Sequence, residues 1–266
     1  MATVTAIEEQ LRALDEGRAF RDRSSDRVLV VRGNDARRWL GDLVTADVAT
    51  LRPDMSRRSL LLSPTGRIRA DLTVAERHDG SFLILQHADQ PEPIGEVLAP
   101  YVLSSAVELE DATTRLSVFE HVASGRLTEH APTGTAEIVV DDAAWEIWRV
   151  RRGDPSMGVD FPLGALAAEA GLDGAIDLQK GCFLGQESVA KIRNLGHPPR
   201  IIRHLRTDAR VAPGEHLTAA GAQVGTVTSV APATDPGWIL LATVDWAAAD
   251  LALTTADGAR ASPVAD

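Results

Sequence analysis

The chain has 266 residues, 44% of them hydrophobic and 24% charged, a composition typical of globular proteins and not of disordered or fibrous ones. It is long enough for one large domain or two modest ones, because domains commonly contain roughly 100–200 residues. The 38 acidic and 27 basic residues give a formal charge of -11, which argues against bulk binding to nucleic acid or anionic lipid.

The first half of the chain alternates between strand and helix patterns. Residues 28–31 form a short apolar run, and apolar side chains at helical spacing over 39–44 follow Asn34 and Asp35, which favour a helix N-terminus. Three strands joined by tight turns are then predicted, at 60–62, 68–74 and 82–85. The Asp79-Gly80 pair favours a type I′ hairpin turn between the last two.

The apolar spacing over 94–102 predicts a second helix, which completes a ferredoxin-like α+β unit. Further strands are expected at 107–109, 116–119, 138–140 and 145–150. A helix is expected over 163–170, where Gly171 would end it.

The pattern changes after the Gly196-His-Pro-Pro199 break. Short extended pieces separated by turn residues at close intervals predict a small β-barrel or sandwich. The two prolines favour a domain boundary here. We therefore expect two α+β subdomains over 1–197 and a C-terminal β-barrel over 198–266.

The only cysteine, Cys182, excludes an internal disulfide and cannot by itself hold zinc or an iron–sulfur cluster, which take about four protein ligands. We predict no metal site within the chain. The first ten residues lack the basic start and apolar centre of a signal peptide, and no stretch approaches the roughly 18–20 apolar residues of a membrane helix. These features predict a cytoplasmic protein outside the membrane.

Residues 176–187 show the most distinctive pattern. We expect a strand ending near 178, a tight turn over 180–182, and a helix opened by Gly185. The N–H groups and dipole at such a helix start favour negative charge, either a thiolate or a ligand carboxylate, with Lys180 as a positive neighbour. The alternative is that Cys182 is a small buried apolar residue and that the glycines only serve the turn.

The string Lys180-Gly-Cys-Phe-Leu-Gly-Gln-Glu187 closely resembles the K-G-C-[YF]-x-G-Q-E signature of the YgfZ family. These proteins are relatives of the glycine-cleavage T-protein, an aminomethyltransferase that uses tetrahydrofolate. Residues 33–47, 61–67 and 149–160 are also similar to motifs of this family. The resemblance covers most of 28–206 and extends to the barrel by position only.

The resemblance implies T-protein-like subdomains around a central pocket for tetrahydrofolate or a one-carbon derivative. It also implies a role in the assembly or maintenance of iron–sulfur enzymes, with a connection to tRNA modification, so that the partners would be folate and iron–sulfur client or assembly proteins. By the same resemblance, Cys182 is the catalytic candidate. The implied folate-binding residues are Asp71, Arg149, Lys180, Gln186 and Glu187.

Other interpretations stay open at this point. Only the second aspartate of the T-protein D-D-L is present, as Asp71, and Arg151 stands where the T-protein has a glutamate that helps to recognise the pterin. The chain could be an accessory factor, a folate-dependent aminomethyl-type transferase, or an interaction module that has lost folate, so its status as an enzyme is undecided. Asp71 could instead pair with Arg67 or Arg69, and Arg149 could form a structural ion pair.

Overall fold

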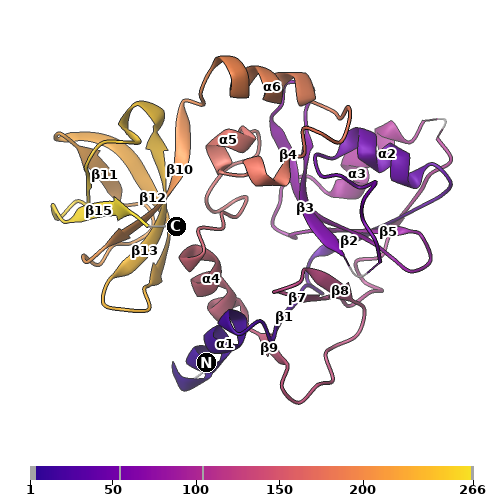
Figure 1. The fold of residues 1–266 in the computed structure, drawn as a ribbon, viewed down its shortest axis with the longest axis horizontal. Coiled ribbons are helices and arrows are strands. Elements are labelled where there is room, and N and C mark those ends of the chain that lie inside the picture. The colour runs from indigo at the N-terminus through magenta and orange to yellow at the C-terminus, as the bar shows by residue number, and fades with distance from the viewer. Residues whose placement is uncertain (1–3, 54, 104, 265–266) are drawn as a thin grey trace. The chain divides into compact units, whose positions relative to one another are not determined.

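The computed structural model describes residues 4–53, 55–103 and 105–264 (Figure 1). The chain forms two compact units. The N-terminal unit contains Met1–Ala144 and Gly174–Ser188, and the barrel unit contains Trp145–Asp173 and Val189–Asp266.

A five-stranded antiparallel sheet lies at the centre of the N-terminal unit, with the strand order β3-β4-β5-β2-β6. Its strands are β2 (Arg27–Arg32), β3 (Ser56–Leu62), β4 (Ile68–Glu76), β5 (Phe82–Gln86) and β6 (Glu108–Asp111). The strands predicted in this region are confirmed. Along β4, buried residues alternate with half-buried ones from Ile68 to Val74, as expected for a strand with one face in a core.

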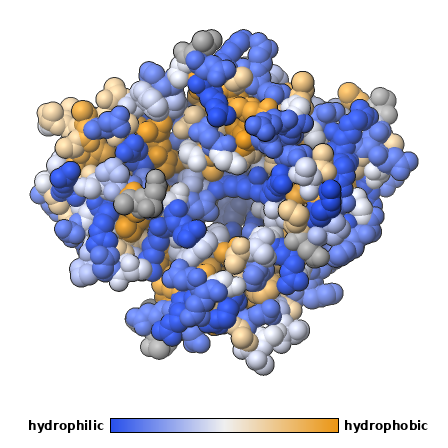
Figure 2. Space-filling model, in the orientation of Figure 1, coloured by the Kyte–Doolittle hydropathy of each residue, from blue (hydrophilic) through white to orange (hydrophobic). Residues whose placement is uncertain are grey.

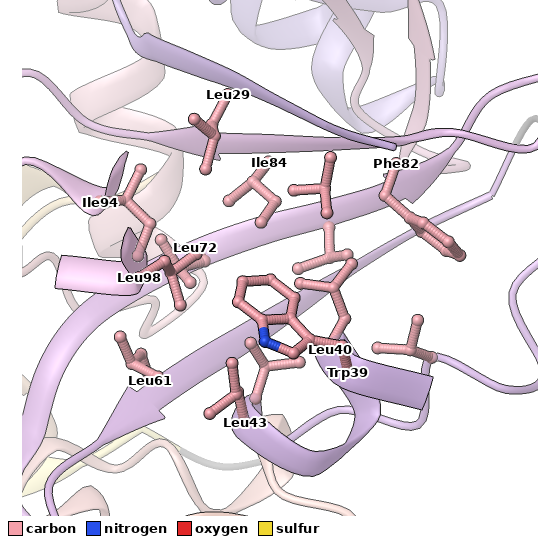
Figure 3. Close-up of a cluster of buried hydrophobic side chains, with 14 of the residues drawn as sticks. Leu29, Trp39, Leu40, Leu43, Leu61, Leu72, Phe82, Ile84, Ile94 and Leu98 are labelled. Atoms are coloured by element: carbon pink, nitrogen blue, oxygen red, sulfur yellow. The ribbon is translucent and has the colours of Figure 1, made fainter. Parts of the chain in front are cut away.

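Two helices cover one face of this sheet. They are α2 (Ala36–Leu43) and α3 (Ile94–Leu98), the latter followed by the 3-10 turn η1 (Ala99–Tyr101). Trp39, Leu40 and Leu43 of α2 point toward Leu61 and Leu72 of the sheet, as Figure 3 shows. Each fully buried leucine of this cluster contributes about 1.5–3 kcal/mol to folding, so the cluster fixes α2 and β3 relative to each other.

The hairpin turn between β4 and β5 is not the predicted type I′. That turn requires a positive φ at both central residues, whereas Gly80 has a φ of +80° and Asp79 has no positive φ. Gly80 N–H donates to the Arg77 carbonyl, and the Asp79 carboxylate accepts from Ser81 N–H. The side-chain bond of Asp79 thus stabilises a longer loop in which the glycine alone is left-handed.

A second sheet of the N-terminal unit has the order β8-β7-β1-β9. Its strands are β1 (Ala19–Asp22), β7 (Phe119–His121), β8 (Arg126–Thr128) and β9 (Ile138–Val140). The helix α1 (Val4–Asp15) contacts β1 and β9. The strand predicted at 116–119 is therefore displaced, because pairing with β1 begins only at Phe119.

The strand expected at 145–150 is wrong, because this segment forms the helix α4 (Asp142–Arg151). Asp141 accepts a hydrogen bond from Ala144 N–H at 2.8 Å, as an N-cap residue does. Ile147 and Val150, one helical turn apart, pack together in an apolar cluster of the barrel unit. The cap and this spacing outweigh the β-propensity of the tryptophans and valine.

The predicted barrel is confirmed as a closed six-stranded barrel of order β10-β13-β12-β11-β14-β15, orange to yellow in Figure 1. Its strands are β10 (Arg200–Thr207), β11 (His216–Ala219), β12 (Ala222–Pro232), β13 (Trp238–Asp245), β14 (Leu253–Thr254) and β15 (Arg260–Pro263). The 3-10 turn η3 (Trp246–Ala248) directly follows β13 in the chain. The expected helix near 163–170 is shorter, α5 (Ala167–Ala170), and ends at Gly171 with a φ of +69°.

The molecular surface is largely polar on the face drawn in Figure 2, where hydrophobic residues form small separate patches. Within the described ranges, every helix is too short or too polar to cross a membrane.

Candidate functional site

The signature segment lies in the N-terminal unit between η2 (Asp173–Ala175) and α6 (Gln186–Leu195). The helix is predicted correctly, but the strand expected to end near 178 is wrong, since residues 176–185 are irregular. Asp177 makes one ladder-like bond, from its N–H to the Thr45 carbonyl at 3.0 Å. Its carboxylate then accepts from Gln179 N–H at 2.8 Å, which bends the chain away from further pairing.

Thr45 connects the signature segment to the sheet. It is fully buried, and its hydroxyl donates to the Ala175 carbonyl at 2.7 Å while accepting from Leu60 N–H at 2.8 Å. Thr45 belongs to the 33–47 motif, and its hydroxyl binds Ala175, which directly precedes residues 176–187 and lies about 130 residues further along the chain. The sequence pattern marked this threonine but gave it no role.

The Lys180 ammonium binds the C-terminal end of α2. Its Nζ donates to the carbonyls of Gly41 and Val44, at 2.6 and 2.5 Å, and lies 5.2 Å from the centre of the Phe183 ring. Burial lowers the pKa of Lys180 to about 8, although Asp47 and other nearby carboxylates oppose that change. The positive charge expected beside Cys182 or a folate is thus used to satisfy the end of a helix.

Gly185 allows the segment to touch the β3–β4 turn. Its φ is +84°, and a Cβ at this position would lie 2.5 Å from the Ser63 carbonyl oxygen. The Ser188 hydroxyl of α6 donates to the carbonyl of Pro64, in the same turn, at 3.1 Å. The 61–67 motif therefore packs directly against the signature.

Cys182 lies at the exposed tip of this segment, and its thiol is free. The alternative of a buried apolar cysteine is therefore wrong. Phe183 beside it is buried, and its N–H donates to the Gln186 side chain at 3.2 Å. Leu184 packs against the main core and donates its N–H to the Asp42 carbonyl. Anchored neighbours thus hold a solvent-exposed sulfur.

Asp71 lies on β4, between Ala70 and Leu72, whose side chains enter the α2 core. Its carboxylate forms a two-pronged ion pair with Arg58, at 2.9 and 2.5 Å, and not the expected pair with Arg67 or Arg69. This partner sits diagonally across the β3–β4 ladder and follows from the hairpin register.

The backbone of Asp71 is held as well, because its N–H and carbonyl both bind the Gln90 side chain. Among the described residues, no hydrogen bond or ion pair joins Asp71 to the signature segment. A carboxylate offers about four acceptor positions, so Asp71 keeps capacity for further donors beyond Arg58.

Arg149 belongs to the barrel unit, where its side chain is 3% exposed. It donates to Asp160 at 2.8 Å, to Ser229 at 3.0 Å, to Glu146 at 2.8 Å and to the Asp154 carbonyl at 3.0 Å. With the second contact to Glu146, these bonds engage all five guanidinium N–H groups. Arg149 therefore forms a structural ion pair and retains no N–H group to donate to a folate carboxylate.

Arg151 also serves the barrel unit. Its Nε donates to the Pro232 carbonyl at 2.7 Å, and Nη2 to the Ala233 carbonyl at 3.3 Å, at the end of β12. The residue that replaces the T-protein glutamate thus binds backbone carbonyls of the barrel, where a glutamate could not donate.

The fold and the three meeting motifs define a class of protein with a T-protein-like α+β region and a C-terminal barrel. Residues 2–122 match the family described as the GCVT N-terminal domain. The aminomethyltransferase T of the glycine cleavage system from Bartonella henselae has the same fold, with a TM-score of 0.78 over 100% of this chain and 90% of that one, at 17% identity.

Three curated proteins are similar to parts of this sequence. An uncharacterized protein of Haemophilus influenzae is 24% identical over 76% of this chain and 80% of its own. An iron-sulfur cluster assembly factor IBA57 homolog, mitochondrial, of Cryptococcus neoformans is 25% identical over 67% of this chain, which spans 64% of it. A putative chloroplastic transferase of Arabidopsis thaliana is 33% identical over 35% of this chain, which spans only 21% of it. The chain is thus similar to the T-protein in its N-terminal region and in its fold, and to an IBA57 homolog in sequence, in line with the resemblance of its motifs to the YgfZ family.

Proposed function

We propose that this protein is a folate-binding accessory factor that supports iron–sulfur enzymes, with Cys182 as its reactive residue. The observation that carries the proposal is the exposed thiol between Lys180 and Phe183, both of which are anchored by hydrogen bonds. The T-protein fold supports the folate, and similarity to a protein named as an iron-sulfur cluster assembly factor supports the clients.

Two carboxylates of the N-terminal unit could bind a folate as hydrogen-bond acceptors. Asp71 retains lone pairs beyond its pair with Arg58, and Glu187 carries an exposed carboxylate in the first turn of α6. These groups would accept N–H bonds from the ring system, and the folate would supply its one-carbon unit. Lys180 and Gln186 would act by holding the segment in place, and Arg149 is left out because its donors are engaged.

The cysteine is tested in cells that lack the native gene. Wild type, Cys182→Ala and Asn194→Ala are expressed at equal levels, and activities of iron–sulfur enzymes are compared with that of a cluster-free enzyme. We expect Cys182→Ala to lose the rescue and Asn194→Ala, a control at an exposed position of α6, to keep it. Full rescue by Cys182→Ala would remove the thiol from the mechanism.

The folate is tested separately by calorimetric titration and thermal shift with tetrahydrofolate and its one-carbon derivatives. We expect saturable binding that Asp71→Asn weakens. The absence of both heat and thermal shift would leave the interaction module, an alternative favoured by the engagement of Arg151 with the barrel. Turnover of a one-carbon tetrahydrofolate, abolished by Asp71→Asn, would instead establish the transferase.

Two further parts of the proposal concern the cell. We propose the cytoplasm as the compartment, which fractionation of cells that express the tagged full chain tests directly. A role in tRNA modification would appear as loss of modified nucleosides from the tRNA of cells that lack the gene.

A further inference from the structure

The barrel unit contains a pocket of about 650 Å³ that the proposed function does not use. This volume lies within the range of about 300–1,000 Å³ that is common for small-molecule sites. Strands β10, β12 and β13 contribute to it, together with α5 and the segment before it. Its lining includes Phe161, Pro162, Glu169, Thr226, Thr243 and Asp245.

Two hydroxyl groups in the pocket lack partners. Thr226 and Thr243 are direct neighbours across the β12–β13 ladder, which places their Cβ atoms about 5 Å apart. Among the described residues, neither hydroxyl forms a hydrogen bond, whereas the nearby Thr228 hydroxyl donates to the buried Asp160 at 2.6 Å. The pocket therefore offers an adjacent pair of unused hydroxyls on a rigid sheet.

Two carboxylates add acceptors. One oxygen of Glu169 accepts a hydrogen bond from Leu166 N–H at 2.7 Å, and one oxygen of Asp245 forms an ion pair with Arg200 Nε at 3.2 Å. The second oxygen of each makes no hydrogen bond within the described part of the chain. Arg149 neutralises Asp160 and Arg200 pairs with one oxygen of Asp245, so among the described residues Glu169 is the pocket carboxylate without a cationic partner, and the pocket favours a cation that donates hydrogen bonds.

The pocket suits an organic cation better than a metal ion. Among residues 4–53, 55–103 and 105–264, no group of three or more histidine, cysteine or acidic side chains is arranged to hold a metal ion. Phe161 and Pro162 contribute apolar surface beside the acceptors, which suits methylene groups. A ligand with ammonium groups on an aliphatic chain matches both features.

We propose that this pocket binds an aliphatic polyamine, whose ammonium groups donate to Glu169, Asp245 and the two threonine hydroxyls. Calorimetric titration of the full-length protein with spermidine at 150 mM salt is expected to give one site per chain. Glu169→Gln and the double variant Thr226→Val/Thr243→Val are each expected to weaken binding about tenfold, since each removes bonds to a charged donor. Both keep side-chain size, and a thermal melt checks their folding.

Asp250→Asn is the matched control, because it removes one exposed negative charge from the same unit outside the pocket. Equal weakening in this control, or several weak sites that 150 mM salt abolishes, would show general attraction to a chain of charge -11 and overturn the site. The absence of binding at millimolar spermidine would also overturn it. Tetrahydrofolate binding by the same variants is expected to be unchanged, which separates this proposal from the proposed function.

Discussion

The contact between Gly185 and the β3–β4 turn gives a sharp test of how the signature segment is held. Replacing Gly185 with alanine forces a side chain into a backbone conformation with a φ of +84°. It also places a Cβ 2.5 Å from the Ser63 carbonyl and 3.1 Å from the Leu62 Cβ. The nearest atom belongs to the backbone of a turn in which Ser63 N–H donates to the Arg67 carbonyl and the Ser63 carbonyl accepts from Gly66 N–H, so it cannot move aside cheaply.

The magnitude follows from two contributions. A left-handed conformation costs a residue with a Cβ about 1–2 kcal/mol, and overpacking costs about 1–3 kcal/mol more. We therefore expect Gly185→Ala to lower the free energy of unfolding by about 2–5 kcal/mol. Gly181→Ala is the matched control in the same segment, because Gly181 has a φ of +106° but no atom within 4 Å of the Cβ position, so only the first cost applies.

Urea unfolding followed by circular dichroism measures the difference. With a slope of about 2 kcal/mol per molar urea, the Gly185→Ala midpoint is expected about 0.5–1.5 M below that of Gly181→Ala, with equal slopes. Equal midpoints for the two variants would refute the packing of the segment against the turn.

Three further predictions concern charge and exposure. Burial lowers the pKa of Lys180 from 10.5 to about 8, so between pH 8 and 10.5 the unfolded chain binds more protons than the folded one. The free energy of unfolding should therefore rise with pH in this range, and urea titrations should show no such rise for Lys180→Met. Asp160→Asn leaves Arg149 buried with only the exposed Glu146 carboxylate as its counter-charge and should cost about 1–3 kcal/mol in calorimetric unfolding, whereas Arg149→Met/Asp160→Leu should recover part of that loss. Cys182 should react with one equivalent of a thiol reagent in the native protein, and reaction only after denaturation would contradict its exposure.

The elements that the sequence predicts well are those whose periodicity reflects a single buried face. Alternation along β4 and the short pieces of the barrel belong to this kind. The helix α4 was predicted as a strand because its two tryptophans and valine favour strands, while the capping bond of Asp141 depends on local geometry that the pattern does not show. Residues 176–178 do not form the expected strand, because Asp177 makes one ladder-like bond to Thr45 and its carboxylate then bends the chain by accepting from Gln179 N–H.

The candidate site was located by its motif, but the partners of its residues were not predictable. Lys180 binds Gly41 and Val44, and Thr45 binds Ala175, across about 130 residues or more. Such contacts depend on how the elements pack, which a local pattern does not encode. The Arg58 partner of Asp71 is different, since the register of the β3–β4 hairpin would have supplied it.

These contacts change what the signature means chemically. Lys180 closes a helix end, Phe183 and Leu184 are buried, Gly185 permits a close approach, and Gln186 binds a backbone N–H. Packing thus accounts for most of the string without any ligand. It does not account for the thiol at position 182, which folding leaves in solvent where serine or alanine would fit equally well. Cys182→Ala should therefore leave the free energy of unfolding unchanged, whereas substitutions of its buried neighbours should lower it. In an assay of function, Cys182→Ala should be more damaging than those substitutions.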